Sequence, residues 1–218
     1  MKKIIIIDGG PRKNYNTAQM LQKFADGVKS VGEEIEVKTI RLYGMEFKGC
    51  MSCMACKLKD KTSKLCKFKD ALTPVLEDIA DADGLVMGSP IYFSEVTAEL
   101  RKLLERLIFP WLSYKDFSVT APKRMPVVLC YTMNANPQQA ETIYQSMAII
   151  EGVLARALDK PEHIDAYNTY QVKNYDRYEL DAFPEPMKRQ WRDEHWEADL
   201  QKAFDAGKRM AERISKEG

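Results

Sequence analysis

Four cysteines are the residues whose spacing most directly suggests chemistry. Cys50, Cys53 and Cys56 recur at every third residue and Cys66 follows ten positions later, whereas the fifth cysteine, Cys130, stands alone. Thiolates at this spacing can ligate three corners of a [4Fe–4S] cube, and a distant cysteine can complete the set. The same residues could instead form a four-thiolate zinc site, a redox-active thiol pair, or a loop of reduced cysteines that holds no metal.

Positive charge surrounds these cysteines. Seven lysines lie within residues 48–69, where Asp60 is the only acidic residue. We expect this charge to lower the pKa of the thiols and to offset an anionic cluster. By contrast, Cys130 lies in an apolar segment and is expected to be a small core residue. His163 and His195 are expected to be structural or surface residues, since no Cys, Asp or Ser pattern around them indicates a metal site or a catalytic triad.

Residues 9–17, GGPRKNYNT, combine glycines, two cations and an Asn-Thr pair directly before a helical pattern. Backbone N–H groups at a helix N-terminus, the helix dipole and the Arg12 guanidinium would together favour a phosphate. The alternative is a polar loop in which Asn16 or Thr17 merely caps the helix. The loop matches neither the Walker A pattern nor G-x-G-x-x-G, which argues against a nucleotide triphosphatase and against a Rossmann dinucleotide fold.

A second loop, residues 88–94, places Tyr92 and Phe93 beyond a strand that ends at Pro90. A flat ligand could lie against these rings, or both rings could be ordinary core residues. A third loop follows another strand and reads Thr132, Met133, Asn134, Ala135.

Apolar runs and the spacing of apolar residues predict the strands and helices that position these loops. We expect strands at residues 4–7, 35–40, 84–88, 127–131 and 163–167. Helical spacing predicts helices from about Thr17 to before Gly32, from Thr73 as the cap to Ala80, and from Thr97 to before Pro110. It predicts two more helices, through Ile143 to Leu154 and over about 187–216. Residues 173–186 show neither the helical nor the strand period. Strands that alternate with helices predict a doubly wound parallel sheet, which binds its ligands outside the carboxyl ends of the strands.

Length and composition narrow the function classes. The chain has 218 residues, 33 Lys+Arg against 32 Asp+Glu, and 45% hydrophobic residues, so it is expected to be one globular domain. A net charge of +1 gives no reason to expect binding to nucleic acid or to an anionic membrane. With no secretory signal and no apolar run of transmembrane length, the chain is expected to be cytoplasmic, where thiols stay reduced.

These loops together resemble those of the flavodoxin-like NAD(P)H-dependent FMN reductases, and more closely the iron–sulfur flavoprotein branch, over about residues 1–135. The family's G-S-P-R-x-x-x-N-T phosphate loop is similar to residues 9–17, with Gly10 where Ser is usual. Its P-x-Y-F loop is matched by residues 90–93, and its A-x-L-K-x-x-x-D-R helix by residues 98–106. The branch's C-x2-C-x2-C triplet is matched by residues 50–56, and Cys66 could fill the fourth position after a spacer longer than the usual one.

The resemblance implies one flavodoxin-like domain over residues 1–218, with five parallel strands in the order 2-1-3-4-5, helices on both faces, a Cys-rich loop at 44–69 and a C-terminal helix. It implies an enzyme that binds FMN, accepts hydride from NADPH or NADH, passes electrons to a small acceptor and uses no catalytic side chain. The alternatives are an electron carrier with a [4Fe–4S] cluster and a ferredoxin-like partner, or a non-catalytic FMN-binding or zinc-binding module.

The FMN-binding residues implied are Gly10, Arg12, Asn14, Asn16, Thr17, Ser89, Pro90, Ile91, Tyr92, Phe93, Thr132, Met133 and Asn134, and the metal ligands Cys50, Cys53, Cys56 and Cys66. Flavin reductases of this fold commonly form homodimers in which one subunit covers the flavin of the other, so the resemblance implies a homo-oligomer, and Trp111, Tyr114 and Phe117 are the aromatic residues we place at the interface.

Overall fold

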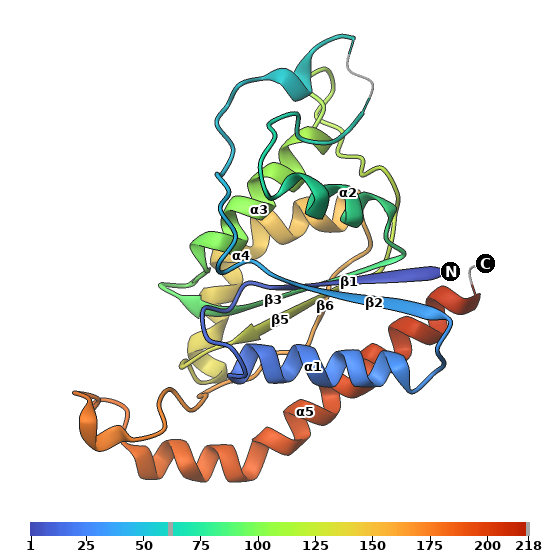
Figure 1. Cartoon of the computed structure of the whole chain (residues 1–218). Helices are drawn as coiled ribbons and strands as arrows, with labels where there is room; N and C mark the ends of the chain where they lie inside the picture. The colour runs from blue at the N-terminus through green and yellow to red at the C-terminus, as the bar shows by residue number, and fades with distance from the viewer. Residues whose placement is uncertain (61–62, 217–218) are drawn as a thin grey trace.

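A parallel sheet forms the centre of the molecule (Figure 1). The computed structural model describes residues 1–60 and 63–216. The strands follow the order β2-β1-β3-β5-β6, and all neighbours in this path are parallel. Their bounds are β1 Lys2–Asp8, β2 Ile35–Arg41, β3 Gly84–Tyr92, β5 Val127–Thr132 and β6 Glu162–His163. The parallel α/β architecture that the sequence predicts is therefore confirmed.

The predicted count of five strands is wrong, because the described residues contain a sixth, β4 (Glu95–Val96). It pairs antiparallel with the end of β3 and lies off the main strand order. The strand predicted at 163–167 is also shorter than expected, since β6 ends at His163. There the Asp165 carboxylate, not a main-chain carbonyl, accepts the hydrogen bond from the Tyr131 N–H (2.9 Å), and pairing resumes only as a single bridge at Ala166.

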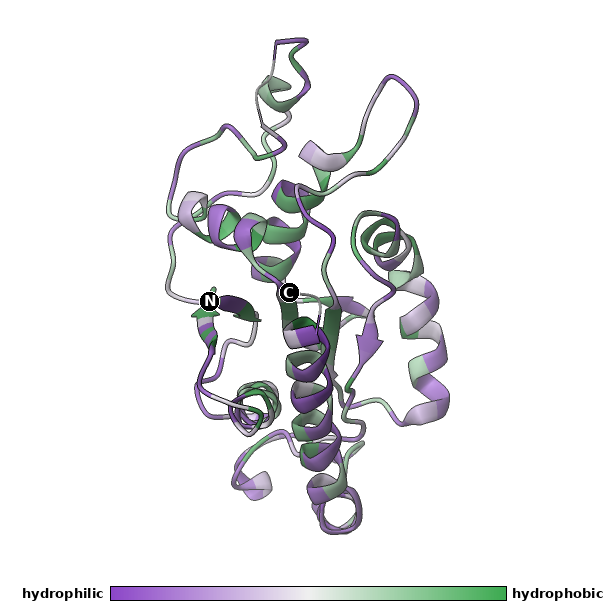
Figure 2. Cartoon of the chain, turned by 90° about the vertical axis from the view of Figure 1, so that its right-hand side faces the viewer, coloured by the Kyte–Doolittle hydropathy of each residue, from purple (hydrophilic) through white to green (hydrophobic). Residues whose placement is uncertain are grey.

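Helices cover both faces of the sheet, as expected for a strand such as β1 in which four isoleucines are fully buried. One face carries α1 (Asn16–Lys29) and α5 (Glu185–Lys216), and the other carries α2 (Thr73–Asp81), α3 (Ala98–Ile108) and α4 (Pro137–Ala157) (Figure 1). Figure 2 shows the strands as an apolar layer between helices whose outer faces are polar. Ile5 and Ile7 pack into the core under one set of helices, and Ile4 and Ile6 pack into the other.

Two glycines allow α1 and α5 to cross in backbone contact. A Cβ atom added at Gly27 would lie 1.9 Å from the carbonyl oxygen of Phe204, and one added at Gly207 would lie 2.0 Å from that of Phe24. Both positions therefore exclude a larger residue. This contact fixes the C-terminal half of α5 on the sheet, while its N-terminal half extends past the sheet (Figure 1).

Two local expectations are corrected at the helix ends. The cap of α2 is Leu72, and Thr73 is its first residue, because Asp70 accepts a hydrogen bond from the Leu72 N–H (3.0 Å) and forms the turn before the helix. Trp111 lies in a short 3-10 turn, Phe109–Trp111, after α3, and is only 3% exposed, so it is a core residue and not the interface aromatic that we expected.

Two further 3-10 turns span Ala55–Lys57 and Tyr175–Arg177. Among the described residues, no helix has the length and apolarity needed to cross a membrane.

Candidate functional site

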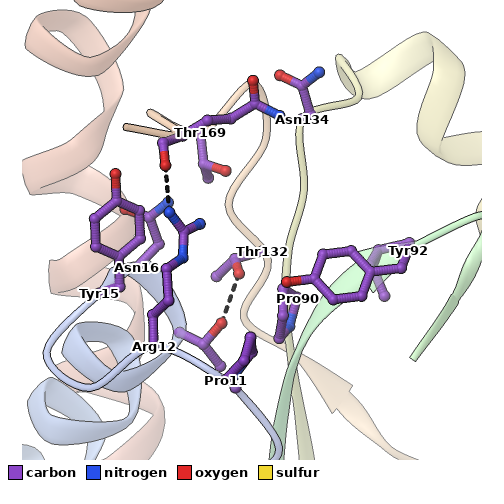
Figure 3. Close-up of a pocket in the computed structure, with 13 residues that line it drawn as sticks. Pro11, Arg12, Tyr15, Asn16, Pro90, Tyr92, Thr132, Asn134 and Thr169 are labelled. Atoms are coloured by element: carbon purple, nitrogen blue, oxygen red, sulfur yellow. Dashed lines mark hydrogen bonds between the residues drawn. The ribbon is translucent and has the colours of Figure 1, made fainter. Parts of the chain in front are cut away.

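A pocket opens at the carboxyl edge of the sheet (Figure 3). Arg12, Tyr15 and Asn16 lie on one side of it, and Pro90 and Tyr92 lie on the opposite side. The complete lining is Gly10, Pro11, Arg12, Tyr15, Asn16, Thr17, Pro90, Ile91, Tyr92, Thr132, Asn134, Thr169 and Gln171.

The loop before α1 is held from below. The Gly9 N–H donates to the Gly88 carbonyl (2.8 Å), and a Cβ at Gly9 would lie 2.9 Å from that same oxygen, so the approach requires glycine. The Gly10 N–H donates to the Asp8 carboxylate (2.8 Å), and the Arg41 guanidinium donates to the carbonyl of Gly10 (3.3 Å). Burial raises the pKa of Asp8, although the Gly10 N–H and Arg41 act in the opposite direction. The Arg41 guanidinium also donates to the Pro11 carbonyl, so two carbonyls of this loop are bound by the same cation.

The N-terminus of α1 faces this pocket without a side-chain cap. Its N-cap residue is Tyr15, and no side chain bonds to the cap position, so the interpretation of Asn16 or Thr17 as a simple cap is wrong. Asn16 instead donates to the Tyr170 carbonyl (2.8 Å), and the Thr17 hydroxyl bonds to that of Thr132 (2.7 Å). The first N–H groups of a helix have no intrahelical acceptor, so here they remain available to an anion.

Arg12 adds a cation at the same end of the pocket. Its guanidinium lies 3.7 Å from the centroid of the Tyr15 ring and donates to the Gln171 carbonyl. Asn14, which we also predicted to bind FMN, is exposed, has a left-handed backbone (φ +57°) and accepts at its carbonyl from the Gln19 side chain (2.9 Å). The structure does not place Asn14 in the pocket wall.

The loop after β3 supplies the aromatic side of the pocket. Phe93 and Ser94 have positive φ angles of 51° and 62°, and they form the turn between β3 and β4. Tyr92 is 45% exposed and Phe93 is fully exposed, so the interpretation of these rings as core residues is wrong. Ser89 is buried beneath the loop, where its hydroxyl accepts from the Thr97 N–H (2.9 Å) and donates to the Pro90 carbonyl (2.7 Å). Ser89 thus supports the loop without lining the pocket.

The third loop contributes Thr132 and Asn134, whereas Met133 is 2% exposed and points into the core. Sequence reasoning missed Thr169 and Gln171, which close the pocket from the segment after β6. Thr169 is tied to the third loop because both its N–H (2.9 Å) and its hydroxyl (3.1 Å) donate to the Met133 carbonyl. No periodic pattern or motif in the sequence marks these two residues.

All four clustered cysteines line a second pocket, beside the C-terminal end of α3, where Glu105 and Arg106 also line it. Cys50 and Cys53 are exposed, Cys66 is half-buried and Cys56 is buried. Burial raises the pKa of Cys56 and outweighs the neighbouring Lys57 cation, so the expectation of a lowered thiol pKa is wrong at this residue. Within residues 1–60 and 63–216, no three His, Cys, Asp or Glu side chains are arranged to hold a single metal ion.

Two adjacent residues of α3 hold both arms of the cysteine loop. Glu105 accepts from the Cys50 N–H (3.1 Å) on the first arm. Arg106, whose side chain is completely buried, donates to the Cys66 sulfur (3.3 Å) and to the Phe68 carbonyl (2.7 Å) on the second arm, and pairs with the Asp70 carboxylate (2.6 Å). The four thiols therefore share one pocket whose two arms are both bound to α3.

The remaining cysteine and the histidines lie outside both pockets. Cys130 is fully buried, as expected for a core residue. His163 lies 3.2 Å from both Asp165 and Glu151; burial alone would lower its pKa, but these hydrogen bonds raise it to about 10. His195 stacks on Trp191 with ring centroids 4.0 Å apart.

Five parallel strands in this order, with β4 off the path and helices on both faces, have the arrangement of flavodoxin-like proteins. Residues 2–156 match the family model described as NADPH-dependent FMN reductase, and the chain belongs to this family. Curated relatives include an iron-sulfur flavoprotein of Archaeoglobus fulgidus (38% identical over 104 residues, 48% of each chain) and one of Methanocaldococcus jannaschii (34% identical over 104 residues, 48% of this chain and 51% of the relative). The chain therefore matches about half the length of these relatives.

Solved structures agree with this fold. The NAD(P)H:quinone oxidoreductase from Methanothermobacter marburgensis has a TM-score of 0.69 and 16% identity over 95% of this chain and 98% of its own. An FMN-dependent NADH-azoreductase from Bacillus anthracis, in complex with FMN, has a TM-score of 0.66 and 13% identity over 96% of this chain and 100% of its own. At such identities the likeness concerns the fold alone.

Proposed function

We propose that this protein is an FMN-dependent oxidoreductase that takes hydride from NADPH or NADH and passes electrons to a small acceptor. One observation carries the proposal: a single pocket has an anion-binding end, with Arg12 beside the uncapped N-terminus of α1, and an aromatic end at Tyr92. FMN has the complementary parts, a phosphate and a flat ring. The residues present therefore fit the cofactor that the family implies.

FMN, when bound, supplies the hydride acceptance and the electron transfer. In this proposal the chain's own residues bind and orient. Arg12, Asn16, Thr17 and the α1 N–H groups hold the phosphate, and residues 90–93 with the third loop place the ring. Gly10, where the family usually has Ser, leaves room for Asp8, because a Cβ there would lie 3.0 Å from the Asp8 carboxylate.

We also propose that residues 1–218 form one domain that assembles into a homo-oligomer. Of the three aromatic residues expected at an interface, Tyr114 and Phe117 are 55% and 72% exposed. Phe93, fully exposed beside the pocket, is a further apolar surface that a second copy would cover.

The first test of the proposed function is an anaerobic absorbance spectrum of the purified protein, followed by mixing with NADPH and with NADH. We expect flavin absorbance that bleaches promptly with one or both nucleotides. A flavin spectrum that stays oxidised with both would indicate a non-catalytic FMN-binding module. A protein that neither contains nor binds FMN would contradict the proposal outright.

The second test concerns the phosphate. We expect Arg12→Met to weaken FMN binding by about 10- to 100-fold, the value of one hydrogen bond to a charged group, while riboflavin affinity stays the same. Lys13→Met is the matched control, since Lys13 is exposed in the same loop but does not line the pocket. Equal losses for FMN and riboflavin would show that Arg12 does not contact the phosphate.

A second candidate function is electron transfer through an iron–sulfur cluster to a ferredoxin-like carrier, because four cysteines line one pocket that α3 holds in place. After anaerobic purification, we expect iron and sulfide at about four of each per chain, lost in Cys56→Ala and kept in the core control Cys130→Ala. Less than about half a cluster per chain, unchanged by Cys56→Ala, would contradict this candidate. Stoichiometric zinc in place of iron would support the zinc-binding alternative.

A further inference from the structure

Lys188 on α5 is a fully buried lysine, and no carboxylate within residues 1–60 and 63–216 pairs with it. Its ammonium donates to the main-chain carbonyl of Asn134 (3.3 Å), to the side-chain oxygen of Asn134 and to the side-chain oxygen of Asn168. The Phe183 ring centroid lies 5.4 Å away. Among the ion pairs of the described residues, none includes Lys188, and burial lowers its pKa to about 8. At neutral pH the ammonium is therefore a buried positive charge compensated only by neutral oxygens.

A buried charge of this kind lowers the free energy of unfolding. Burial of an ammonium without a counterion costs several kcal/mol, and an apolar side chain of similar length would avoid that loss. A positioning role alone explains the three hydrogen bonds, but it does not explain why the donor carries a charge. The charge itself therefore calls for a partner that the protein does not supply.

Of the two residues bound by Lys188, one lines the pocket and the other adjoins a residue that does. Asn134 lines the pocket in the third loop, and Asn168 precedes Thr169, which lines it from the opposite chain segment (Figure 3). The Asn168 N–H also donates to the carbonyl of Ala135 (2.9 Å), so the two segments are joined by main chain as well as by Lys188. The ammonium thus lies directly behind the wall formed by these two segments.

The family match ends at residue 156, so Lys188 lies in the part of the chain that the family model does not cover. We propose that Lys188 is a positioning residue whose buried positive charge, behind Asn134 and Asn168, favours the reduced form of FMN over the oxidised form. The inference rests on the proposed function. Reduction places negative charge on the flavin ring, and a nearby cation in a region shielded from water stabilises that charge more than it stabilises the neutral oxidised ring.

The test compares two neutral variants with a surface control. Lys188→Met removes the charge and the donors, and Lys188→Gln removes the charge but keeps an amide donor. Lys208→Met removes a lysine from the same helix where the side chain is 53% exposed. For each protein, the dissociation constant of oxidised FMN is measured by fluorescence titration, and the midpoint potential of bound FMN is measured by anaerobic equilibration with redox dyes at pH 7.

We expect both Lys188 variants to bind reduced FMN about tenfold more weakly relative to oxidised FMN, which corresponds to a potential about 30 mV more negative for a two-electron couple. Lys208→Met should keep the wild-type potential. A wild-type potential in both Lys188 variants would overturn the inference, and an equal loss of affinity for both redox forms would reduce Lys188 to a purely structural role. If wild-type protein binds no FMN, the proposed function itself fails, and the titration of oxidised FMN shows this separately.

Discussion

The strongest single anchor of the cysteine loop is Arg106, and Arg106→Met is the substitution that tests it. The side chain is 0% exposed and donates five hydrogen bonds: two to Asp70 (2.6 and 2.7 Å), one each to the carbonyls of Phe68 (2.7 Å) and Lys48 (3.2 Å), and one to the Cys66 sulfur (3.3 Å). Methionine fills a similar volume but leaves Asp70 without its cation. Breaking a buried ion pair in this way costs about 3–5 kcal/mol.

We expect the lower end of this range, about 3 kcal/mol, because Asp70 keeps the N–H bonds of Lys48 (3.1 Å) and Leu72 (3.0 Å). For a chain of this size the loss corresponds to a melting temperature lower by about 6–12 °C. Burial would raise the pKa of Asp70, but Arg106 and these N–H groups hold it below the usual 3.8. The stabilisation is therefore present above about pH 4 and is lost as the pH falls further.

The assay is urea unfolding at pH 7 of wild type, Arg106→Met, Asp70→Asn and the double variant. Each single variant leaves one charge unpaired, so the double variant should lose clearly less than the sum of the two single losses. Strict additivity, or a loss below about 1 kcal/mol in Arg106→Met, would refute the reasoning.

Three further predictions concern the packing, the charges and one buried hydrogen bond. Gly27→Ala should destabilise the fold by about 3 kcal/mol, since its Cβ would lie 1.9 Å from a main-chain oxygen of α5. The control Gly152→Ala in α4, whose Cβ would have nothing within 4 Å, should stabilise the fold by about 0.5–1 kcal/mol. Similar effects of the two substitutions in thermal unfolding would contradict the role of the α1–α5 contact. His163→Gln should be less stable than wild type, with the largest difference below pH 6.5 and a progressively smaller one as the pH rises toward 10. A difference in the free energy of unfolding by urea that does not depend on pH would count against the His163 ion pairs. Thr97→Val removes a buried hydroxyl that donates to the Gly9 carbonyl in the loop before α1 (2.8 Å), and should cost about 1–3 kcal/mol in urea unfolding that Thr97→Ser restores. Wild-type stability in Thr97→Val would contradict this role of the bond.

The parts of the fold that follow from local rules could be predicted from the sequence. The isoleucine run of β1 and the leucine spacing of α3 are signals within one element, and parallel pairing brings the loops after β1, β3 and β5 to one edge. Thr169 and Gln171 could not be predicted in the same way. They follow an edge strand of two residues, and their positions depend on contacts with distant residues, such as the bond from Asn16 to the Tyr170 carbonyl (2.8 Å).

The position of α5 against α1 could not be predicted from the sequence either. Its apolar spacing predicts an amphipathic helix, but the backbone contact with α1 depends on Gly27 and Gly207, which lie 180 residues apart and show their relation only in the folded chain. The same holds for Lys188. In the sequence it is one more charge on a highly charged helix, and only the structure shows that it is buried behind the pocket wall.

Helix α3 connects the two pockets mechanically. At its N-terminus Thr97 donates to the Gly9 carbonyl in the loop before α1 (2.8 Å), and near its C-terminus Arg106 binds residues of the cysteine loop. These residues are nine positions apart, which is about 14 Å along a helix axis. Because a packed helix does not change length, the distance between the pockets is fixed and neither pocket should deform when the other is altered. We therefore expect both Cys56→Ala and Arg106→Met to change the FMN dissociation constant by less than about threefold. Arg106→Met should also disorder the cysteine loop, which protease cleavage within that loop would show. A large loss of FMN affinity in either variant would mean that the pockets are coupled through a route other than the rigid helix.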